Sequence, residues 1–575
     1  MSRIGVFVCH CGINIAGTVD VKRVAKEIRQ HPDVVYSKEY RYMCSEPGQR
    51  LLREAIEKRD LNGVVVAACS PAMHEKTFRG TSASVGLNPY RCEIANIREQ
   101  CSWVHEQEPE RATEKALEII NTLVERVTRD EQLEPFSLSL TKQALVIGGG
   151  VAGMQTALDI ANAGHPVVLV EREDHLGGKM AQLSGTYINF DAAPHLLQRR
   201  IEEVLNHPNI EVLTNAEVVG LEGYVGNFEV AASEDSRPNE SETSNPEPET
   251  HHFEVGAIVV ATGWDSYSLE RLPEYGGGKI PDVVDGLTFE GMLQVMPRRP
   301  SDGRVPSEVV FIQCAGSRDP ERGVPYCSKV CCMYVAKQAM MFKERVPEGQ
   351  AYVFYIDIRS AGKGYDEYVQ RAMEEHDILY LRGKVSKVFQ NGDKVVVWGA
   401  DTLSGQPVEV AADLVVLATP MAPSRQVQEL AQTLRVSVDQ NGFLSEAHPK
   451  LRPVESLTAG VFLAGAAQGP KDIPEATSQA SGAAAKVLQL FSHDEMIQEP
   501  TVAYVIEEVC SGCGVCVEAC PYEARAIDPM RGIVTINAAL CQNCGACVVA
   551  CPNKASQIYN WTPEQILAMA DVLVS

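Results

Sequence analysis

The sequence predicts an α/β protein of several domains, with a small α+β domain near its C-terminal end. The chain has 575 residues, more than one hydrophobic core usually holds. Apolar strand-like runs alternate with helical segments through most of the chain, which is typical of parallel sheets. Near the C-terminus this alternation stops, and two copies of one cysteine pattern follow. We therefore expect at least three modules of different architecture.

Composition and charge narrow the classes of function. The formal net charge of -24 at pH 7 argues against binding to nucleic acid or to an anionic membrane. The first residues lack the features of a signal peptide, and no run reaches the roughly 18 apolar residues of a membrane-spanning helix. We therefore expect a cytoplasmic protein with no membrane span. Because disulfides rarely persist in the cytosol, the 18 cysteines indicate metal ligands first.

Residues 1–135 are predicted to form a parallel α/β domain. Strands are expected at Ile4–Cys9, Tyr36–Cys44 and Gly63–Cys69, and helices at Val21–Gln30, Gln49–Lys58 and Glu110–Val127. Cys9, Cys44 and Cys69 each end a predicted strand, and Cys11 lies in the turn after the first. The carboxyl ends of parallel strands share one edge of a sheet, so these thiols can converge on a [4Fe–4S] cluster. Two alternatives remain open, namely Cys101 as a ligand and buried cysteines that bind no metal.

Residues 142–495 form a larger module that opens with a dinucleotide-binding pattern. The strand Ala144–Ile147 is followed by GxGxxG and the helix Ala152–Ala163, and Glu171 follows the next strand. The three glycines are Gly148, Gly150 and Gly153. They allow a tight turn and bring a pyrophosphate close to the N-terminus of the helix, where N–H groups favour anions. Glu171 is expected to accept a hydrogen bond from a ribose hydroxyl.

An acidic segment interrupts this module. Residues 233–252 contain many Pro, Ser and Glu and almost no apolar side chains. Such a segment cannot bury enough surface to order itself, so it is predicted to be a flexible loop.

A second cysteine group lies in the same module. The predicted strand Val309–Gln313 runs directly into it. Its members are Cys314, Cys327, Cys331 and Cys332. Four thiols are enough for one [4Fe–4S] cluster, and the alternative is a set of buried free thiols that behave as small hydrophobes.

Residues 500–560 carry the most specific pattern in the chain, C-x2-C-x2-C-x3-C-P in two copies. The first copy is Cys510, Cys513, Cys516 and Cys520, and the second is Cys541, Cys544, Cys547 and Cys551. This is the pattern of two-cluster bacterial ferredoxins, in which the fourth cysteine of each copy ligates the other cluster. Zinc commonly uses separated C-x2-C pairs instead. The segment 561–575 is predicted to be a C-terminal helix.

Several segments of the larger module resemble the thioredoxin reductase-like flavoproteins. These segments are Leu176–Lys179, Ile258–Gly263 and Gly460–Gly465. The resemblance implies FAD as the dinucleotide, with Gly178, Lys179, Thr262, Gly263 and Gly465 among its binding residues. The aspartate usual after the last glycine is absent, since Ala466 stands there. The second GxGxxG, which binds NAD(P)H in that group, is replaced by the cysteines from Cys314 onward.

Taken together, these motifs and the opening segment Val8–Gly12 resemble the A-type subunits of heterodisulfide reductase. The resemblance implies FAD, a cluster beside the flavin, and a lysine near the flavin ring that corresponds to Lys337, which would otherwise be a solvated helix lysine. The implied partners are heterodisulfide reductase B- and C-type subunits, ferredoxin, and an electron-donor subunit such as a hydrogenase adapter or an NADH- or formate-linked protein. A homodimer within a larger complex is also expected.

These inferences predict an electron-transfer oxidoreductase subunit. It would relay electrons among FAD and several [4Fe–4S] clusters, and the resemblance implies that the flavin can bifurcate an electron pair. The alternative is a self-contained NAD(P)H-dependent flavoprotein reductase, against which the missing second glycine motif argues.

Overall fold

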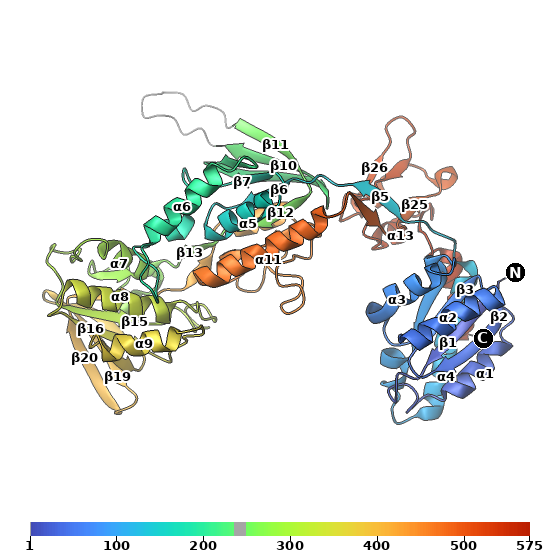
Figure 1. The fold of residues 1–575 in the computed structure, drawn as a ribbon, viewed down its shortest axis with the longest axis horizontal. Helices are drawn as coiled ribbons and strands as arrows, with labels where there is room; N and C mark the ends of the chain where they lie inside the picture. Colours follow the sequence, from blue (N-terminus) through green and yellow to red (C-terminus); the bar gives the residue numbers. More distant parts are fainter. Residues whose placement is uncertain (1, 235–248, 575) are drawn as a thin grey trace. The chain divides into compact units, whose positions relative to one another are not determined.

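The computed structural model describes residues 2–234 and 249–574, which divide into two compact units. Unit 1 consists of Met1–Leu138 and Ile497–Ser575, and unit 2 consists of Ser139–Met496. Figure 1 shows that both ends of the chain belong to unit 1. The N-terminal and C-terminal segments, which are farthest apart in the sequence, therefore belong to the same unit.

The N-terminal part of unit 1 is a four-stranded parallel sheet covered by helices. The sheet order is β2 (Val34–Tyr40), β1 (Ile4–Cys9), β3 (Gly63–Ala68) and β4 (Cys92–Asn96). The helices are α1 (Val21–Glu27), α2 (Glu46–Arg59), α3 (Pro71–Ala83) and α4 (Pro109–Arg129). Every residue of β1 and β3 is buried, which explains why the central strands are continuous apolar runs. The predicted strand at 36–44 was wrong at its end, because β2 stops at Tyr40.

The C-terminal part of unit 1 consists of short elements. They are β25 (Ala503–Val505) paired with β28 (Ser556–Ile558), β26 (Arg525–Ile527) paired with β27 (Val534–Ile536), and the helices α12 (Val515–Glu518) and α13 (Ala546–Ala550). The last helix, α14 (Pro563–Val574), packs on α4. At this contact the guanidinium of Arg126 lies 3.8 Å from the ring centroid of Trp561. The ferredoxin-like part and the N-terminal part therefore pack as one unit.

The first half of unit 2 is a sandwich around a five-stranded parallel sheet. The order is β23 (Val461–Leu463), β12 (Ala257–Val260), β6 (Ala144–Ile147), β7 (Val167–Val170) and β8 (Ile210–Leu213). The helices α5 (Val151–Asn162), α6 (Ala193–Leu205) and α11 (Ile473–Phe491) share a core with one face. The antiparallel strands β9 (Ala216–Tyr224), β10 (Asn227–Glu234) and β11 (Glu249–Val255) share a core with the other.

The second half of unit 2 repeats this plan. Its parallel sheet has the order β14 (Val283–Asp285), β21 (Leu414–Leu417), β15 (Glu308–Ile312), β16 (Gln350–Tyr355) and β17 (Leu379–Arg382). The helices α7 (Gly286–Met292), α8 (Cys331–Arg345) and α9 (Tyr365–Glu374) cover one face, and the antiparallel strands β18 (Lys387–Asn391), β19 (Lys394–Asp401) and β20 (Gln406–Ala412) pack on the other. The pair β13 (Trp264–Ser266) and β22 (Met421–Pro423) connects the halves.

The predicted fold class is confirmed, and one predicted loop is corrected. The acidic segment 233–252 was expected to be a flexible loop, but its first and last residues belong to the paired strands β10 and β11. Residues 235–248 lie outside the described residues. Both ends of the segment lie in paired strands. Side chains along β10 and β11 alternate between more buried and more exposed positions, as is typical of antiparallel strands with one face on the core.

Candidate functional site

The glycine turn after β6 leaves room for a phosphate group beside α5. Gly148 has a φ of 108°, and a Cβ there would lie 2.5 Å from the carbonyl oxygen of Ala261. A Cβ on Gly150 would meet nothing within 4 Å, so this side of the turn is open. No side chain caps α5 at Gly150, and its first N–H groups can therefore bind an anion.

Two of the predicted cofactor-binding glycines are required for close packing. A Cβ on Gly153 would lie 1.7 Å from the carbonyl oxygen of Gly148. Gly465 has a φ of 66°, and a Cβ there would lie 2.7 Å from the Cβ of Ala152. These glycines let the backbone segments around the turn approach one another, so their contribution to the site is through backbone position.

Glu171 follows β7, and its carboxylate holds the glycine turn. Oε2 accepts a hydrogen bond from the N–H of Gly149 at 2.5 Å, and Oε1 accepts one from the N–H of Glu173 at 2.9 Å. The side chain is buried and lines the cavity described below. Since each carboxylate oxygen can accept more than one hydrogen bond, Glu171 can orient the turn and still bind a ligand hydroxyl.

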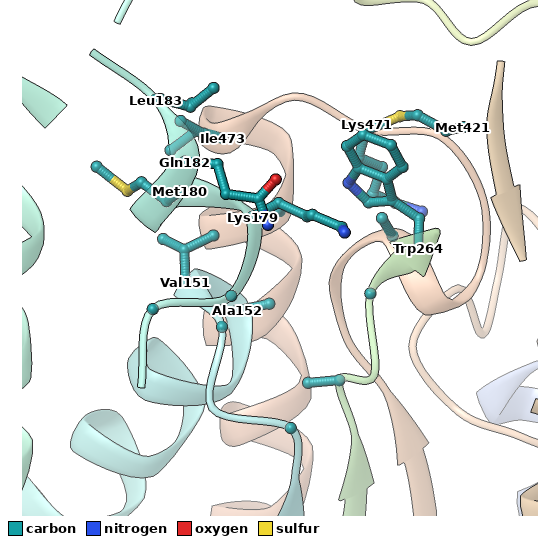
Figure 2. Close-up of a pocket in the computed structure, with 18 of the residues that line it drawn as sticks. Val151, Ala152, Lys179, Met180, Gln182, Leu183, Trp264, Met421, Lys471 and Ile473 are labelled. Atoms are coloured by element: carbon teal, nitrogen blue, oxygen red, sulfur yellow. The ribbon is translucent and has the colours of Figure 1, made fainter. Parts of the chain in front are cut away.

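A cavity of about 830 Å³ is lined by both halves of unit 2. The predicted residues that line it are Gly148, Gly150, Glu171, Gly178, Lys179, Thr262, Gly263 and Lys337. The hydroxyl of Thr262 is buried without a hydrogen-bond partner, as expected of a group that binds a ligand. Figure 2 shows Lys179 extending toward Trp264, whose ring centroid lies 5.6 Å from the Lys179 Nζ. The open turn, the acidic residue and the unsatisfied hydroxyl together fit a dinucleotide.

Lys337, in α8, forms a buried ion pair at the wall of this cavity. Its Nζ lies 2.6 Å from Oε1 of Glu290 and donates to the carbonyl of Gly185 at 2.7 Å. Gln338 donates to the other oxygen of Glu290 at 2.9 Å. Burial lowers the pKa of Lys337, and Glu290 opposes this change. Lys337 is therefore not a solvated helix lysine.

Sequence reasoning missed a polar network at the start of α11. Oδ2 of Asp472 accepts hydrogen bonds from the hydroxyls of Tyr187, at 3.0 Å, and Tyr365, at 2.6 Å. Oδ1 of Asp472 accepts from the N–H of Glu475 at 2.8 Å and so caps the helix. The adjacent Lys471 lines the cavity, and burial lowers its pKa to about 8. The capping pattern is visible in the sequence, but the tyrosines come from distant segments that no local spacing connects.

The loop after β15 and the first turn of α8 bring the second cysteine group together. Cys331 and Cys332 are the first two residues of α8, and both are buried. Burial raises the pKa of Cys331, and the charges of Cys332, Cys314 and Cys327 raise it further, so Cys331 lies within electrostatic range of the other three thiols. The N–H of Arg359 lies 3.3 Å from the Cys332 sulfur and donates to it. A helix N-terminus and N–H donors favour thiolates, the form that binds iron.

Two small cavities in the C-terminal part of unit 1 are lined by thiols. One is lined by Cys510, Cys513, Cys516 and Cys551, and the other by Cys520, Cys541, Cys544 and Cys547. Each set combines three cysteines of one copy with the fourth cysteine of the other. Gly514 and Gly545, with φ of 79° and 78°, begin α12 and α13 and let the cysteine loops fold back.

The N-terminal cysteines meet at the carboxyl edge of the unit 1 sheet. Burial raises the pKa of Cys9 to about 11, and the charges of Cys11 and Cys44 also raise it. Burial raises the pKa of Cys69 as well, with Cys11 contributing and Arg98 opposing. The N–H of Cys11 donates to the Cys9 sulfur at 3.3 Å. Each of the four predicted ligands therefore lies within electrostatic range of at least one other, although Cys44 lies beyond the end of β2.

The alternative ligand Cys101 lies in a different environment. Its thiol is buried and donates to the carbonyl of Ala112, in α4, at 3.0 Å. The charged groups that act on it are Lys115 and Glu118. Across residues 2–234 and 249–574, no three His, Cys, Asp or Glu side chains are arranged around a position for a single metal ion.

Two family models match separate parts of the chain. Residues 142–291 match the pyridine nucleotide-disulphide oxidoreductase family, and residues 509–555 match the 4Fe-4S dicluster domain. Among solved structures, a thioredoxin reductase of T. acidophilum aligns with 61% of this chain and 100% of its own at 17% identity and a TM-score of 0.42. No helix among the described residues is long and apolar enough to cross a membrane.

Curated relatives match nearly the whole chain. The second iron-sulfur A-type protein of the CoB–CoM heterodisulfide reductase of Methanopyrus kandleri is 42% identical over 91% of this chain and 90% of its own length. The A-type protein of the H2:CoB–CoM heterodisulfide,ferredoxin reductase of Methanothermobacter thermautotrophicus is 41% identical, covering 100% of this chain and 97% of its own. The corresponding protein of the ferredoxin/F420H2-dependent CoB–CoM heterodisulfide reductase of Methanosarcina acetivorans is 38% identical over 92% of this chain and 75% of its own.

Proposed function

Since the chain belongs to the A-type family of heterodisulfide reductase subunits, we propose that it is the electron-distributing subunit of a heterodisulfide reductase-type complex. It is an oxidoreductase subunit with FAD and [4Fe–4S] clusters as cofactors. The flavin supplies the exchange between two-electron and one-electron transfer, and the clusters supply one-electron carriers. The observation that carries the proposal is the presence of one dinucleotide cavity and several groups of four cysteines in a single chain.

The residues around the cavity would bind and orient the flavin. The turn at Gly148 and Gly150 would hold the pyrophosphate at the N-terminus of α5, and Glu171 would accept from a ribose hydroxyl. Thr262, whose hydroxyl is otherwise unsatisfied, would bind a polar group of the cofactor. Lys337 would face the flavin ring and donate a hydrogen bond, with Glu290 fixing its position. The remaining members of the proposed set are Gly153, Gly178, Lys179, Gly263 and Gly465.

Four cysteine sets would each hold one cluster. The two C-terminal sets are Cys510, Cys513, Cys516 and Cys551, and Cys520, Cys541, Cys544 and Cys547. The set beside the flavin module is Cys314, Cys327, Cys331 and Cys332, and the N-terminal set is Cys9, Cys11, Cys44 and Cys69. Buried thiols with raised pKa values must lose protons when iron binds, so cluster assembly in these sites releases protons.

The proposed partners follow from the family. They are heterodisulfide reductase B- and C-type subunits, ferredoxin, and an electron-donor subunit of the hydrogenase-adapter, NADH-linked or formate-linked kind. In this proposal the chain forms a homodimer in the cytoplasm, and its flavin divides an electron pair between two acceptors.

The experiment that tests the function is anaerobic reduction of the purified chain with its cofactors. Reduced ferredoxin is expected to reduce the flavin, because cluster donors have a route to it. NADH or NADPH alone is expected to leave the flavin oxidised, since β15 runs into Cys314 where a second glycine-rich nucleotide-binding turn would stand. Rapid bleaching of the flavin absorbance by either nucleotide would favour a self-contained NAD(P)H-dependent reductase instead. Co-purification of the chain from its source then identifies the partners.

A further inference from the structure

The cavity of unit 2 contains lysines whose charges are balanced in different ways. Lys337 and Glu290 form an ion pair of 2.6 Å in which both side chains are almost fully buried, with exposed fractions of 3% and 1%. Glu290 also accepts from the hydroxyl of Ser184 at 2.5 Å and from Gln338. Because this carboxylate lies against the Lys337 ammonium, the pair contributes little net charge to the cavity.

Lys471 lines the same cavity without a carboxylate of its own. Its Nζ donates to Oε1 of Gln468 at 3.1 Å, and no ion pair of Lys471 is found among the described residues. Burial is the main cause that lowers its pKa to about 8, and Lys329 lowers it further, while Glu475 and Glu446 oppose the change. The charge at Lys471 is therefore poorly solvated, which increases its effect on a neighbouring ligand.

The carboxylates around Lys471 already accept hydrogen bonds from other donors. Asp472 accepts from Tyr187, Tyr365 and the N–H of Glu475. Glu475 pairs with Lys329 and also accepts from the N–H of Asp472. Glu446 accepts from Nε2 of Gln468 at 2.7 Å. These bonds hold the surrounding groups in place and leave Lys471 as a desolvated cation at the wall of the cavity.

The backbone fixes where this lysine stands. Lys471 follows Pro470, whose ring restricts its own φ. Lys471 also directly precedes Asp472, which caps the N-terminus of α11 in a complete capping box with Glu475. In Figure 2, Lys471 lies on the same side of the cavity as Trp264 and Met421, which belong to the strands joining the two halves. Lys471 also stands in the segment where the aspartate usual in thioredoxin reductase-like flavoproteins is replaced by Ala466.

We propose that Lys471 supplies a positive charge, not balanced by an ion pair, that favours the reduced, negatively charged form of the bound flavin, and that the Lys337–Glu290 pair adds no net charge. Reduction of the flavin by two electrons and one proton adds one negative charge, and a nearby uncompensated cation stabilises that charge. Lys471 is thus a determinant of the flavin potential, whereas Lys337 acts as an oriented hydrogen-bond donor. This inference rests on the proposed binding of FAD in the cavity.

The test is a redox titration of the flavin in the full chain, with dithionite as the electron source and water as the proton source. Lys471→Met removes the charge and keeps most of the length of the side chain. It is expected to weaken binding of the reduced flavin relative to the oxidised flavin about tenfold, which lowers the two-electron potential by about 30 mV. Lys471→Arg keeps the charge and is expected to restore the potential.

Two controls separate charge from structure. Lys486→Met, which removes a lysine of α11 that pairs with Glu455, is expected to leave the potential unchanged. The double variant Lys337→Met with Glu290→Gln removes both charges of the buried pair, and its potential is expected to change less than that of Lys471→Met. An unchanged potential in Lys471→Met, or a larger change in the double variant, would overturn the inference. Loss of flavin from both Lys471 variants would also overturn it, because that result indicates a structural role.

The proposed function and this inference fail in different ways. If the unmodified chain binds no FAD, the assignment of the cavity is wrong. If the unmodified chain binds FAD and Lys471→Met has the same potential, only the role of Lys471 is wrong.

Discussion

Burial gives individual residues of the cavity their chemical properties. Lys337 and Lys471 are both lysines on the wall of one cavity, and burial lowers the pKa of each. Their partners differ, because Lys337 pairs with Glu290 while Lys471 bonds to the neutral side chain of Gln468. Substitutions at such sites act through the charges that they leave unbalanced.

Lys337→Ala is expected to keep FAD and iron but to lower the flavin potential. The substitution leaves Glu290 as a buried, unpaired carboxylate beside the cavity, which disfavours an additional negative charge. A tenfold loss in relative affinity for the reduced flavin corresponds to about 30 mV for a two-electron couple. Redox titration measures this change. Lys343→Ala, in the same helix but with its Nζ bonded to the Gly349 carbonyl, serves as the control, and equal potentials in both variants would contradict the prediction.

Cys332→Ala is expected to remove one cluster and leave the others in place. Its thiol lies at the start of α8 among the other members of its cysteine group. Iron analysis should show a loss of about four irons per chain, the content of one [4Fe–4S] cluster. Cys101→Ala is the matched control, since that buried thiol donates to the Ala112 carbonyl instead. Full iron content in the Cys332 variant would exclude a cluster at this position.

At the scale of elements, the two short helices of the C-terminal part place thiols from both cysteine copies around the same cavity. Two cysteines of each copy precede α12 or α13, the third lies within the helix, and the fourth follows it. The fourth thiol of each copy lines the cavity of the other copy. With these thiols as ligands, each copy would supply one ligand to the cluster of the other copy.

Paired substitutions test the exchange of ligands between copies. Cys510→Ser combined with Cys551→Ser should cost about four irons, because both residues line one cavity. Cys520→Ser combined with Cys551→Ser should cost about eight, because these residues line different cavities. Iron analysis together with electron paramagnetic resonance counts the clusters that remain. Equal losses in the two double variants would show that the thiols are not exchanged in this way.

At the scale of the whole molecule, unit 1 joins the two ends of the chain. Helix α14 packs on α4, and Gln565 donates to Oδ1 of Asp130 at 2.8 Å in a buried contact. Asn560 donates to the carbonyl of Glu131 at 3.2 Å and accepts from the Glu131 N–H at 2.8 Å. The N-terminal cysteine set and the two C-terminal sets therefore belong to the same compact unit.

The stability of this contact is expected to depend on pH through Asp130. Burial is the main cause that raises the pKa of Asp130 to about 8, and the charge of Glu93 raises it further. The charges of Arg126, Arg91 and Arg79 act in the opposite direction. An unfolded aspartate releases its proton near pH ~4, so between about pH 4 and pH 8 the folded state holds one more proton than the unfolded state. The free energy of unfolding therefore falls as pH rises through this range, by up to about 1.4 kcal/mol per pH unit.

Asp130→Asn should abolish this dependence, because the amide cannot ionise and can still accept from Gln565. Denaturant unfolding at about pH 6 and about pH 8 measures the effect, and the variant should exceed the original chain in stability at the higher pH. Glu106→Gln, at an exposed position, is the control and should behave as the original chain does. An equal loss of stability with pH in Asp130→Asn would refute the role of this carboxyl group.

The sequence by itself determined the features that short-range spacing encodes. The glycine turn follows an apolar strand and opens a helix, so its strand, helix and acidic residue were all predictable from Gln143–Glu171. The exchange of the fourth cysteine was predictable because the loop length fixes which three thiols are adjacent. The end of one strand was not predictable in this way: β2 ends at Tyr40 rather than at Cys44, because the chain turns at Met43 and Cys44 before α2 begins.

Only the tertiary structure decided which distant residues share a site. The burial of Lys337, the cavity position of Lys471 and the docking of α14 on α4 depend on segments that lie far apart in the sequence. That Cys9 and Cys69 lie at the same edge was expected, because both follow strands of one parallel sheet. That Cys101 lies elsewhere became clear only from its hydrogen bond to the carbonyl of Ala112. Local spacing specifies a turn or a helix face, whereas burial and charge balance result from packing between elements, which no local pattern contains.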